Sequence, residues 1–162
     1  MPVKCSPDMP LPRWVYRPGR DAAPDRETLD AVKRLVPPRF DSFVPADLPS
    51  LGYGLALNDS GLFWECHEIL EAIWKVAPQG GRDRILLRAC IQIANANLKA
   101  AMDQPRAAAR LLAEALVELA ELKRRGPTVE GFAATFDANR LAGAGRDALD
   151  DPSQLPVALV EP

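Results

Sequence analysis

The chain has 162 residues, 48% of them hydrophobic and 26% charged, so its length and composition are those of one soluble globular domain. Its formal net charge is −2, with 20 basic and 22 acidic residues, which argues against a nucleic-acid-binding protein that neutralises phosphates along a basic face. The sequence holds a single histidine, which excludes any site that needs two histidine ligands from one chain.

The prolines predict an irregular N-terminal part. Sixteen are present, and they cluster in the first fifty residues and near the C-terminus. Because proline removes a backbone donor and disfavours helix at the preceding residue, we expect residues 1–52 to form a proline-rich arm with one short helix at about 25–36. Asp25 is a suitable N-cap for that helix. Trp14 and Tyr16 indicate that the arm packs across the rest of the domain.

A helical core is predicted over residues 53–141. Four segments carry apolar residues at helical spacing, at about 53–76, 82–103, 105–125 and 129–141. The first of these helices is expected to begin somewhere between 53 and 60. Nothing alternates with the period of a strand for long, so the fold class is all-α, a compact bundle of about four to five helices. The tail at 142–162 is expected to be weakly structured.

The cysteines and the N-terminus indicate the cellular compartment in which the protein is expected. Cys5, Cys66 and Cys90 are odd in number and far apart, which fits free thiols in a reducing compartment better than a disulfide framework. The N-terminus lacks the apolar region of a signal peptide, and no apolar run approaches the roughly 20 residues that a membrane span needs. We therefore expect a cytoplasmic protein with neither a membrane nor a nucleic-acid partner.

The most informative stretch places the only histidine among three acids on one predicted helix. Four of its residues form an apolar face: Cys66, Ile69, Leu70 and Ile73. His67 and Glu71 are four residues apart and lie directly above one another, with Glu68 beside them. Trp64 and Trp74 flank the same strip. Acids without a base on two turns repel one another, so the strip needs partners.

The next predicted helix offers such partners. Its polar residues recur at intervals of three or four and share a narrow arc: Arg84, Arg88, Gln92, Asn95 and Lys99. The short turn at 78–81 should make the two helices antiparallel neighbours. Folding the hairpin about that turn predicts three pairs: Glu71 with Arg88, His67 with Gln92, and Trp64 with Asn95.

Four interpretations fit this cluster. It can be an interhelical network of salt bridges and hydrogen bonds that only fixes the fold. It can be a carboxylate-rich metal site, because His67 to Glu71 reads H-E-x-x-E, one residue away from the H-E-x-x-H of zinc peptidases. It can be a general acid/base site in which His67, tuned by Glu71, moves a proton. It can be a pocket that binds a ligand without catalysis.

We expect a polar pocket between the two helices that binds a small polar or anionic ligand, with acid/base catalysis as a further possibility. The catalytic candidates are His67, Glu68 and Glu71. The ligand-binding candidates are Trp64, Glu65, Trp74, Arg88, Gln92, Asn95 and Lys99. No cofactor is assigned, and no metal is favoured, with His67 and Glu71 as the candidate ligands if one is present. The apolar helix faces allow a homo-oligomer.

Two residues outside the strip are expected to have structural roles. Asn97 falls on the apolar side of its helix, so it must find a backbone or subunit partner if it is buried. Cys66 lies on an apolar face and is expected to be a small core residue.

The run Gly61-Leu62-Phe63-Trp64-Glu65-Cys66-His67-Glu68, followed by Glu71 and Trp74, resembles a prokaryotic family catalogued as domain of unknown function 309. The pattern of that family is an aromatic residue, then Glu-x-His-Glu-x-x-Glu-x-x-Trp, and a later helix of the type Leu-Gln-Gly-Leu-Ile. Here that helix begins Leu87-Arg88-Ala89, and Lys99 stands where the family has Lys or His. The resemblance covers about residues 50–141. It implies a compact helical domain whose acidic-histidine motif faces a neighbouring helix, and it implies no established activity.

Overall fold

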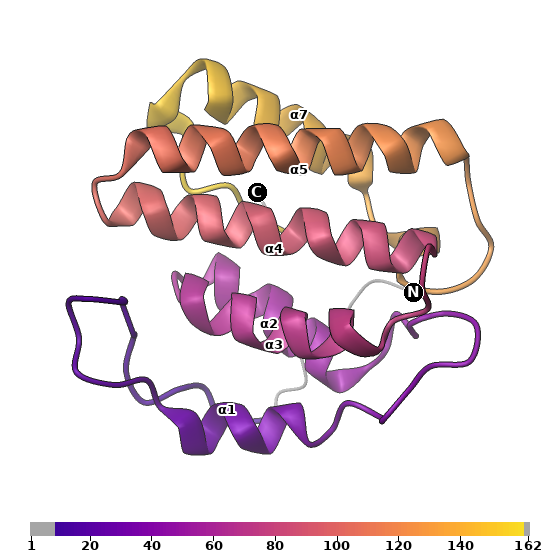
Figure 1. Ribbon diagram of the computed structural model, residues 1–162, viewed down its shortest axis with the longest axis horizontal. Coiled ribbons are helices and arrows are strands. Elements are labelled where there is room, and N and C mark those ends of the chain that lie inside the picture. The colour runs from indigo at the N-terminus through magenta and orange to yellow at the C-terminus, as the bar shows by residue number, and fades with distance from the viewer. Residues whose placement is uncertain (1–8, 161–162) are drawn as a thin grey trace.

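Helices are the only regular secondary structure in residues 9–160, which are the residues that the computed structural model describes (Figure 1). They are α1 (Arg26–Lys33), α2 (Pro49–Asp59), α3 (Phe63–Val76), α4 (Arg82–Ala101), α5 (Pro105–Arg125), α6 (Phe132–Thr135), α7 (Ala138–Asp150) and the 3₁₀-helix η1 (Pro152–Gln154). The all-α prediction is confirmed for this part of the chain, although it holds more helices than the four to five expected. The first eight residues of the predicted arm, with Cys5, and the last two residues of the tail lie outside the described residues.

The helix predicted to reach Val76 is two helices, α2 and α3. The chain turns between them at Gly61, whose φ is +86°. Helix α2 begins at Pro49, before the expected start, with a proline in its first turn, where that residue fits best. Its residues are buried on nearly every side, so it shows no apolar stripe that could have marked its beginning.

The C-terminal part is more helical than predicted. Helix α6 is a single turn, and α7 then continues to Asp150, past Gly143, where weak structure was expected. Gly145 is buried in α7, and a Cβ built on it would lie 3.3 Å from Leu116 Cδ2 on α5. Close packing against α5 therefore outweighs the low helix propensity of glycine at this position.

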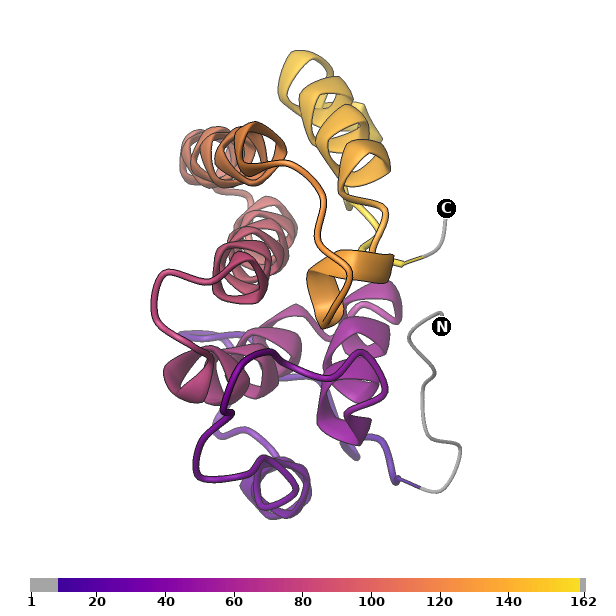
Figure 2. The ribbon, with the colours of Figure 1, turned by 90° about the vertical axis from the view of Figure 1, so that its right-hand side faces the viewer.

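The core lies between the α2–α3 pair and the α4–α5 pair. Figures 1 and 2 show α4 in the middle, with α3 on one side and α5 on the other, and Figure 2 shows α7 beside α5. Cys66 and Cys90 are free thiols in this core, fully buried, which confirms Cys66 as a core residue. Their burial raises the pKa of both thiols well above the ordinary value, so neither forms a thiolate easily. No helix of the described chain is long and apolar enough to cross a membrane.

The segment 9–25 contacts the helices through polar groups. The backbone N–H of Tyr16 donates to Glu65 Oε2 on α3 over 2.9 Å. Arg13 and Asp25 form an ion pair of 2.9 Å, and Asp25 also caps the first turn of α1, as predicted. These contacts bring the N-terminal segment next to the candidate strip of α3.

Candidate functional site

His67 lies on α3 between two carboxylates. Its Nε2 is 2.8 Å from Glu71 Oε2, and its Nδ1 is 3.7 Å from Glu68 Oε1. The four-residue spacing thus brings His67 and Glu71 into direct contact, as the sequence predicts. The histidine side chain is 22% exposed, but Nδ1 itself is buried and has no hydrogen-bond partner in the described part of the chain.

Lysines balance the two carboxylates. Lys33 Nζ, from α1, is 2.7 Å from Glu68 Oε2, and Lys75 Nζ is 3.2 Å from Glu71 Oε1. Burial alone would raise the pKa of Glu71, but Lys75 and His67 together hold it below its ordinary value. Both carboxylates therefore have cationic partners without any contribution from α4.

The predicted partners on α4 face α5 instead. Arg88 Nε is 3.2 Å from Glu118 Oε1, and Gln92 Nε2 donates to Glu114 Oε2 over 2.6 Å. Their predicted pairing with the polar strip of α3 is therefore wrong. Helices α3 and α4 are neighbours, but they meet through their apolar faces. The polar residues Arg88 and Gln92 of α4 pair instead with acidic side chains of α5.

One polar residue of the α4 stripe does reach α3. The guanidinium of Arg84 lies 4.2 Å from the centroid of the Trp74 ring, and its Nη1 donates to the carbonyls of Trp74 and Ala77 over 2.8 and 3.0 Å. This arginine satisfies the free carbonyls at the end of α3, and its guanidinium lies over the ring of Trp74. Asn95 and Lys99 are half-buried, and their side chains make no hydrogen bond or ion pair within residues 9–160.

Trp64 connects the histidine to the N-terminal segment. Its ring lies edge-on to the rings of Tyr16 and His67, with centroids 4.7 and 6.4 Å away. Tyr16 was expected to pack against the domain, but nothing in the local spacing indicated that it would meet this strip. Lys33 was missed for the same reason, because it lies 35 residues before Glu68, on another helix.

Glu65 is a buried carboxylate with one oxygen unpaired. The residue is fully buried, its Oε2 accepts the N–H of Tyr16, and its Oε1 has no partner in the described residues. Burial raises the pKa of Glu65 above its ordinary value, because hydrogen bonding to backbone N–H groups does not offset the loss of water. Glu65 Oε1 and His67 Nδ1 are the two buried side-chain atoms of residues 9–160 without a partner, and both belong to the Glu-x-His motif.

Replacing this carboxyl with an amide, Glu65→Gln, is expected to raise the thermal unfolding midpoint at neutral pH. The folded-state pKa of Glu65 lies above the unfolded value of about 4.3, so between these two values the folded chain binds more protons than the unfolded chain. Its contribution to stability is therefore fully present below the unfolded pKa and is lost as the pH rises through the folded pKa. Glutamine stays neutral and keeps an acceptor for Tyr16. Thermal unfolding measured from pH 4 to pH 8 checks the prediction.

The difference in midpoint between Glu65→Gln and the parent chain should grow as the pH rises. Glu27→Gln is the matched control, because the Glu27 side chain is 88% exposed, and its curve should run parallel to that of the parent chain. A Glu65→Gln curve parallel to the parent curve over the whole range would contradict the raised pKa.

The candidate metal ligands are engaged in ion pairs within the protein. No group of three His, Cys, Asp or Glu side chains in the described residues is placed to hold a metal ion. Glu68 and Glu71, the candidate carboxylates, are already paired with Lys33 and Lys75. The candidate metal ligands, His67 and Glu71, thus form an ion-pair network with lysines.

Comparison with known proteins gives one match. The family model described as Domain of unknown function (DUF309) matches residues 51–111. The matched part is less than half of the chain, but it contains all of α3 and α4 and hence every candidate site residue. No curated protein and no solved structure matches the chain. The description of the family assigns no activity.

Proposed function

We propose that His67, Glu68 and Glu71 form a general acid/base site for a small polar ligand that carries a hydroxyl or amino group. The observation that carries this proposal is the environment of the imidazole. Glu71 holds Nε2, whereas Nδ1 is buried, lacks a partner and lies 3.7 Å from Glu68. A purely structural histidine would be expected to satisfy both ring nitrogens, since an unpaired buried polar atom costs free energy.

Glu71 is placed to orient the imidazole and to balance its charge. When the neutral ring carries its proton on Nε2 and donates it to Glu71, the lone pair of Nδ1 is available to accept a proton. A ligand O–H or N–H that gives its proton to Nδ1 leaves an imidazolium, which the Glu71 carboxylate stabilises. Glu68, beside Nδ1, supplies an acceptor for a second donor of the same ligand.

The charges around the strip favour a ligand with donors over an anion. The predicted anion-binding residue Arg88 pairs with Glu118 on α5, and Lys33 and Lys75 are paired with the acids of α3. The strip therefore offers acceptors, namely an imidazole nitrogen and carboxylate oxygens. An alcohol or an amine matches these groups, and a carboxylate or phosphate does not.

His67 is the only imidazole of the chain, so its NMR signals report on this site alone. We expect the neutral ring to be the Nε2–H tautomer, and we expect ethanolamine, which carries both kinds of donor, to shift the His67 ring signals saturably. Propionate has no donor at neutral pH and should leave them unchanged. Nitrogen-15 spectra of the ring give the tautomer, and a titration of each compound gives the response.

Two variants sharpen this experiment. Glu68→Gln should weaken the ethanolamine response by about tenfold, because a charge-assisted hydrogen bond becomes a neutral one. Glu114→Gln is the matched control, since Glu114 faces Gln92 on the other side of α4, and it should leave the response unchanged. An Nδ1–H tautomer, or the absence of a saturable shift with ethanolamine, would overturn the proposal.

The alternative, a network that only fixes the fold, is favoured by the 2.7 Å ion pair between Lys33 and Glu68, which joins α1 to α3. It predicts that His67→Ala lowers the free energy of unfolding by about 1–3 kcal/mol, because Glu71 loses its hydrogen bond, and that ethanolamine has no effect on the parent chain. The acid/base site predicts a smaller loss of stability and an ethanolamine response that His67→Ala abolishes. Urea denaturation together with the titration separates the two.

A further inference from the structure

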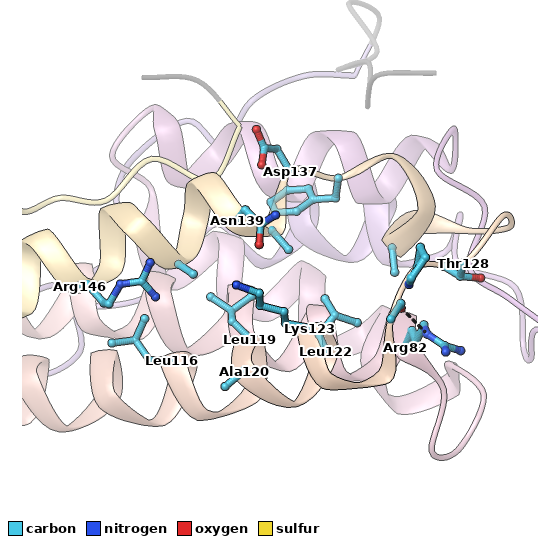
Figure 3. Close-up of a pocket in the computed structure, with 16 residues that line it drawn as sticks. Arg82, Leu116, Leu119, Ala120, Leu122, Lys123, Thr128, Asp137, Asn139 and Arg146 are labelled. Atoms are coloured by element: carbon cyan, nitrogen blue, oxygen red, sulfur yellow. Dashed lines mark hydrogen bonds between the residues drawn. The ribbon is translucent and has the colours of Figure 1, made fainter.

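A groove of about 530 Å³ lies between α5 and α7, on the opposite side of α4 from the histidine (Figure 3). The groove remains open because the chain that connects α5 to α7 runs out of the layer that these two helices form. The N–H of Phe132 donates to the Val44 carbonyl over 2.8 Å, and the N–H of Ala133 donates to Asp83 over 2.7 Å. These bonds tie α6 to the loop before α2 and to the start of α4, so α6 covers only the end of the space between α5 and α7.

Apolar side chains form part of the lining of the groove, beside the polar groups. These apolar side chains come from α5, from α6 and the residue after it, and from the first half of α7: Leu116, Leu119, Ala120, Leu122, Ala133, Phe136, Ala138 and Ala142. The volume of the groove lies within the range of about 300–1,000 Å³ that small-molecule sites occupy. Along α5, the span from Leu116 to Leu122 is about 9 Å, which suits a short unbranched chain.

The rim of the groove is basic although the whole chain carries a net charge of −2. Arg82, Lys123 and Arg146 line it, against one acid, Asp137. The Asp137 carboxylate caps α7 by accepting the N–H of Arg140, so it is already engaged. A local excess of positive charge beside apolar side chains matches a ligand with an anionic head and an apolar chain.

Two of these cations have no partner in the described part of the chain. Arg82 donates to the carbonyls of Arg125 and Gly126, which fixes its position. In contrast, the exposed side chains of Lys123 and Arg146 make no hydrogen bond or ion pair among residues 9–160. They come from α5 and α7, and Figure 3 shows both on the groove, so one anionic group between the helices could engage both.

We propose that this groove binds a carboxylate with an unbranched apolar chain, of the medium-chain fatty acid class. The carboxylate pairs with Lys123 and Arg146, and the chain lies on the leucines of α5 and on Phe136. The groove shares no residue with the strip of α3, so this inference stands independently of the acid/base site.

Octanoate is the probe, and two further compounds test its apolar chain and its carboxylate separately. Octan-1-ol has a chain of the same length without the charge, and acetate has the carboxylate without the chain. We expect octanoate to bind saturably at one site per chain in calorimetry, and both other compounds to bind at least about tenfold more weakly. Either compound binding as tightly as octanoate would overturn the proposal.

The double variant Lys123→Gln/Arg146→Gln should weaken octanoate binding by at least about tenfold. Its matched control is Arg106→Gln/Arg110→Gln, which removes the same charge from exposed positions of α5 outside the groove and should leave binding unchanged. Ala142→Phe fills the groove and should abolish binding, while circular dichroism shows that the helices are kept.

Three further results would overturn the assignment. They are no saturable binding of octanoate, equal weakening by both double variants, and self-association of the chain that Ala142→Phe abolishes. The second would indicate a nonspecific effect of charge. The third would assign the groove to a second copy of the chain.

Discussion

Removing the carboxyl group of Asp83, in the variant Asp83→Ala, is expected to lower the free energy of unfolding by about 4 kcal/mol. Asp83 is 95% buried in the first turn of α4, and its two oxygens accept the backbone N–H groups of Val44 and Ala133, each over 2.7 Å. A hydrogen bond to a charged group contributes about 1.5–3 kcal/mol, and alanine leaves both donors unpaired. Urea denaturation followed by circular dichroism measures the loss.

The size of this effect follows from the position of Asp83, where three segments meet. Val44 belongs to the loop before α2 and Ala133 to α6, so this one carboxylate joins both to α4. The junction is also tight, since a Cβ on Gly131 would collide with Asp83 Oδ2, and Gly131 has a φ of +85°. Gly131→Ala should therefore destabilise the same junction.

Two variants control for other causes of the loss. Asp83→Asn keeps one oxygen acceptor and turns an amide donor toward the other N–H, so it should cost roughly half as much as Asp83→Ala. Asp147→Ala removes an exposed aspartate of α7 and should change stability by less than about 0.5 kcal/mol. If Asp83→Ala were as mild as Asp147→Ala, the carboxylate would not hold the three segments together.

Helices whose ends carry strong local signals could be predicted from the sequence. The segments expected at about 82–103 and 105–125 are α4 and α5, Arg82–Ala101 and Pro105–Arg125. Glycine precedes the first, proline begins the second, and Gly-Pro follows it, so local backbone chemistry sets these boundaries. The start of α2 and the length of α7 depend on burial and packing, which spacing along the chain does not reveal.

In the candidate site, too, local contacts could be predicted from the sequence, and contacts between distant segments could not. The contact between His67 and Glu71 is local to one helix, and helical spacing predicts it. Lys33 and Tyr16 come from segments 35 and 49 residues away from their partners. Helical periodicity says which residues share a face, but not which neighbour that face meets. This is why Arg88 was assigned to α3 although it pairs with α5.

Asn97 is the case in which the sequence predicted the need for a partner but not its identity. This residue is on the apolar side of α4 and is 1% exposed. Its Nδ2 donates to Asn58 Oδ1 over 2.8 Å and to the Val157 carbonyl over 2.9 Å, and its Oδ1 accepts the Val157 N–H over 2.8 Å. One side chain therefore pairs both backbone groups of Val157 and links α4 to α2 and to the segment after η1.

Asn97→Ala is expected to lower the free energy of unfolding by about 3 kcal/mol. Three hydrogen bonds are lost, and the buried N–H of Val157 and Oδ1 of Asn58 are left without their partner, each at a cost of about 1–3 kcal/mol. Asn58 still donates to the Val157 carbonyl over 3.1 Å, so the loss stays below the full sum. Urea denaturation measures it, and amide hydrogen exchange at Val157 should become faster.

Asn95→Ala is the matched control for this prediction, because Asn95 lies on the same helix two residues earlier and its side chain makes no hydrogen bond in the described chain. It should change stability by less than about 0.5 kcal/mol and leave exchange at Val157 unaltered. If the two alanine variants were equally stable and Val157 stayed protected in both, the segment after η1 would be held by its apolar contacts.

The apolar contacts of the segment after η1 are the buried side chains of Val157 and Leu159, which are 3% and 0% exposed. Because apolar burial has no direction, it fixes the register of an irregular segment poorly, whereas paired hydrogen bonds to one residue fix it closely. The amide of Asn97 is therefore expected to set where the C-terminal segment lies.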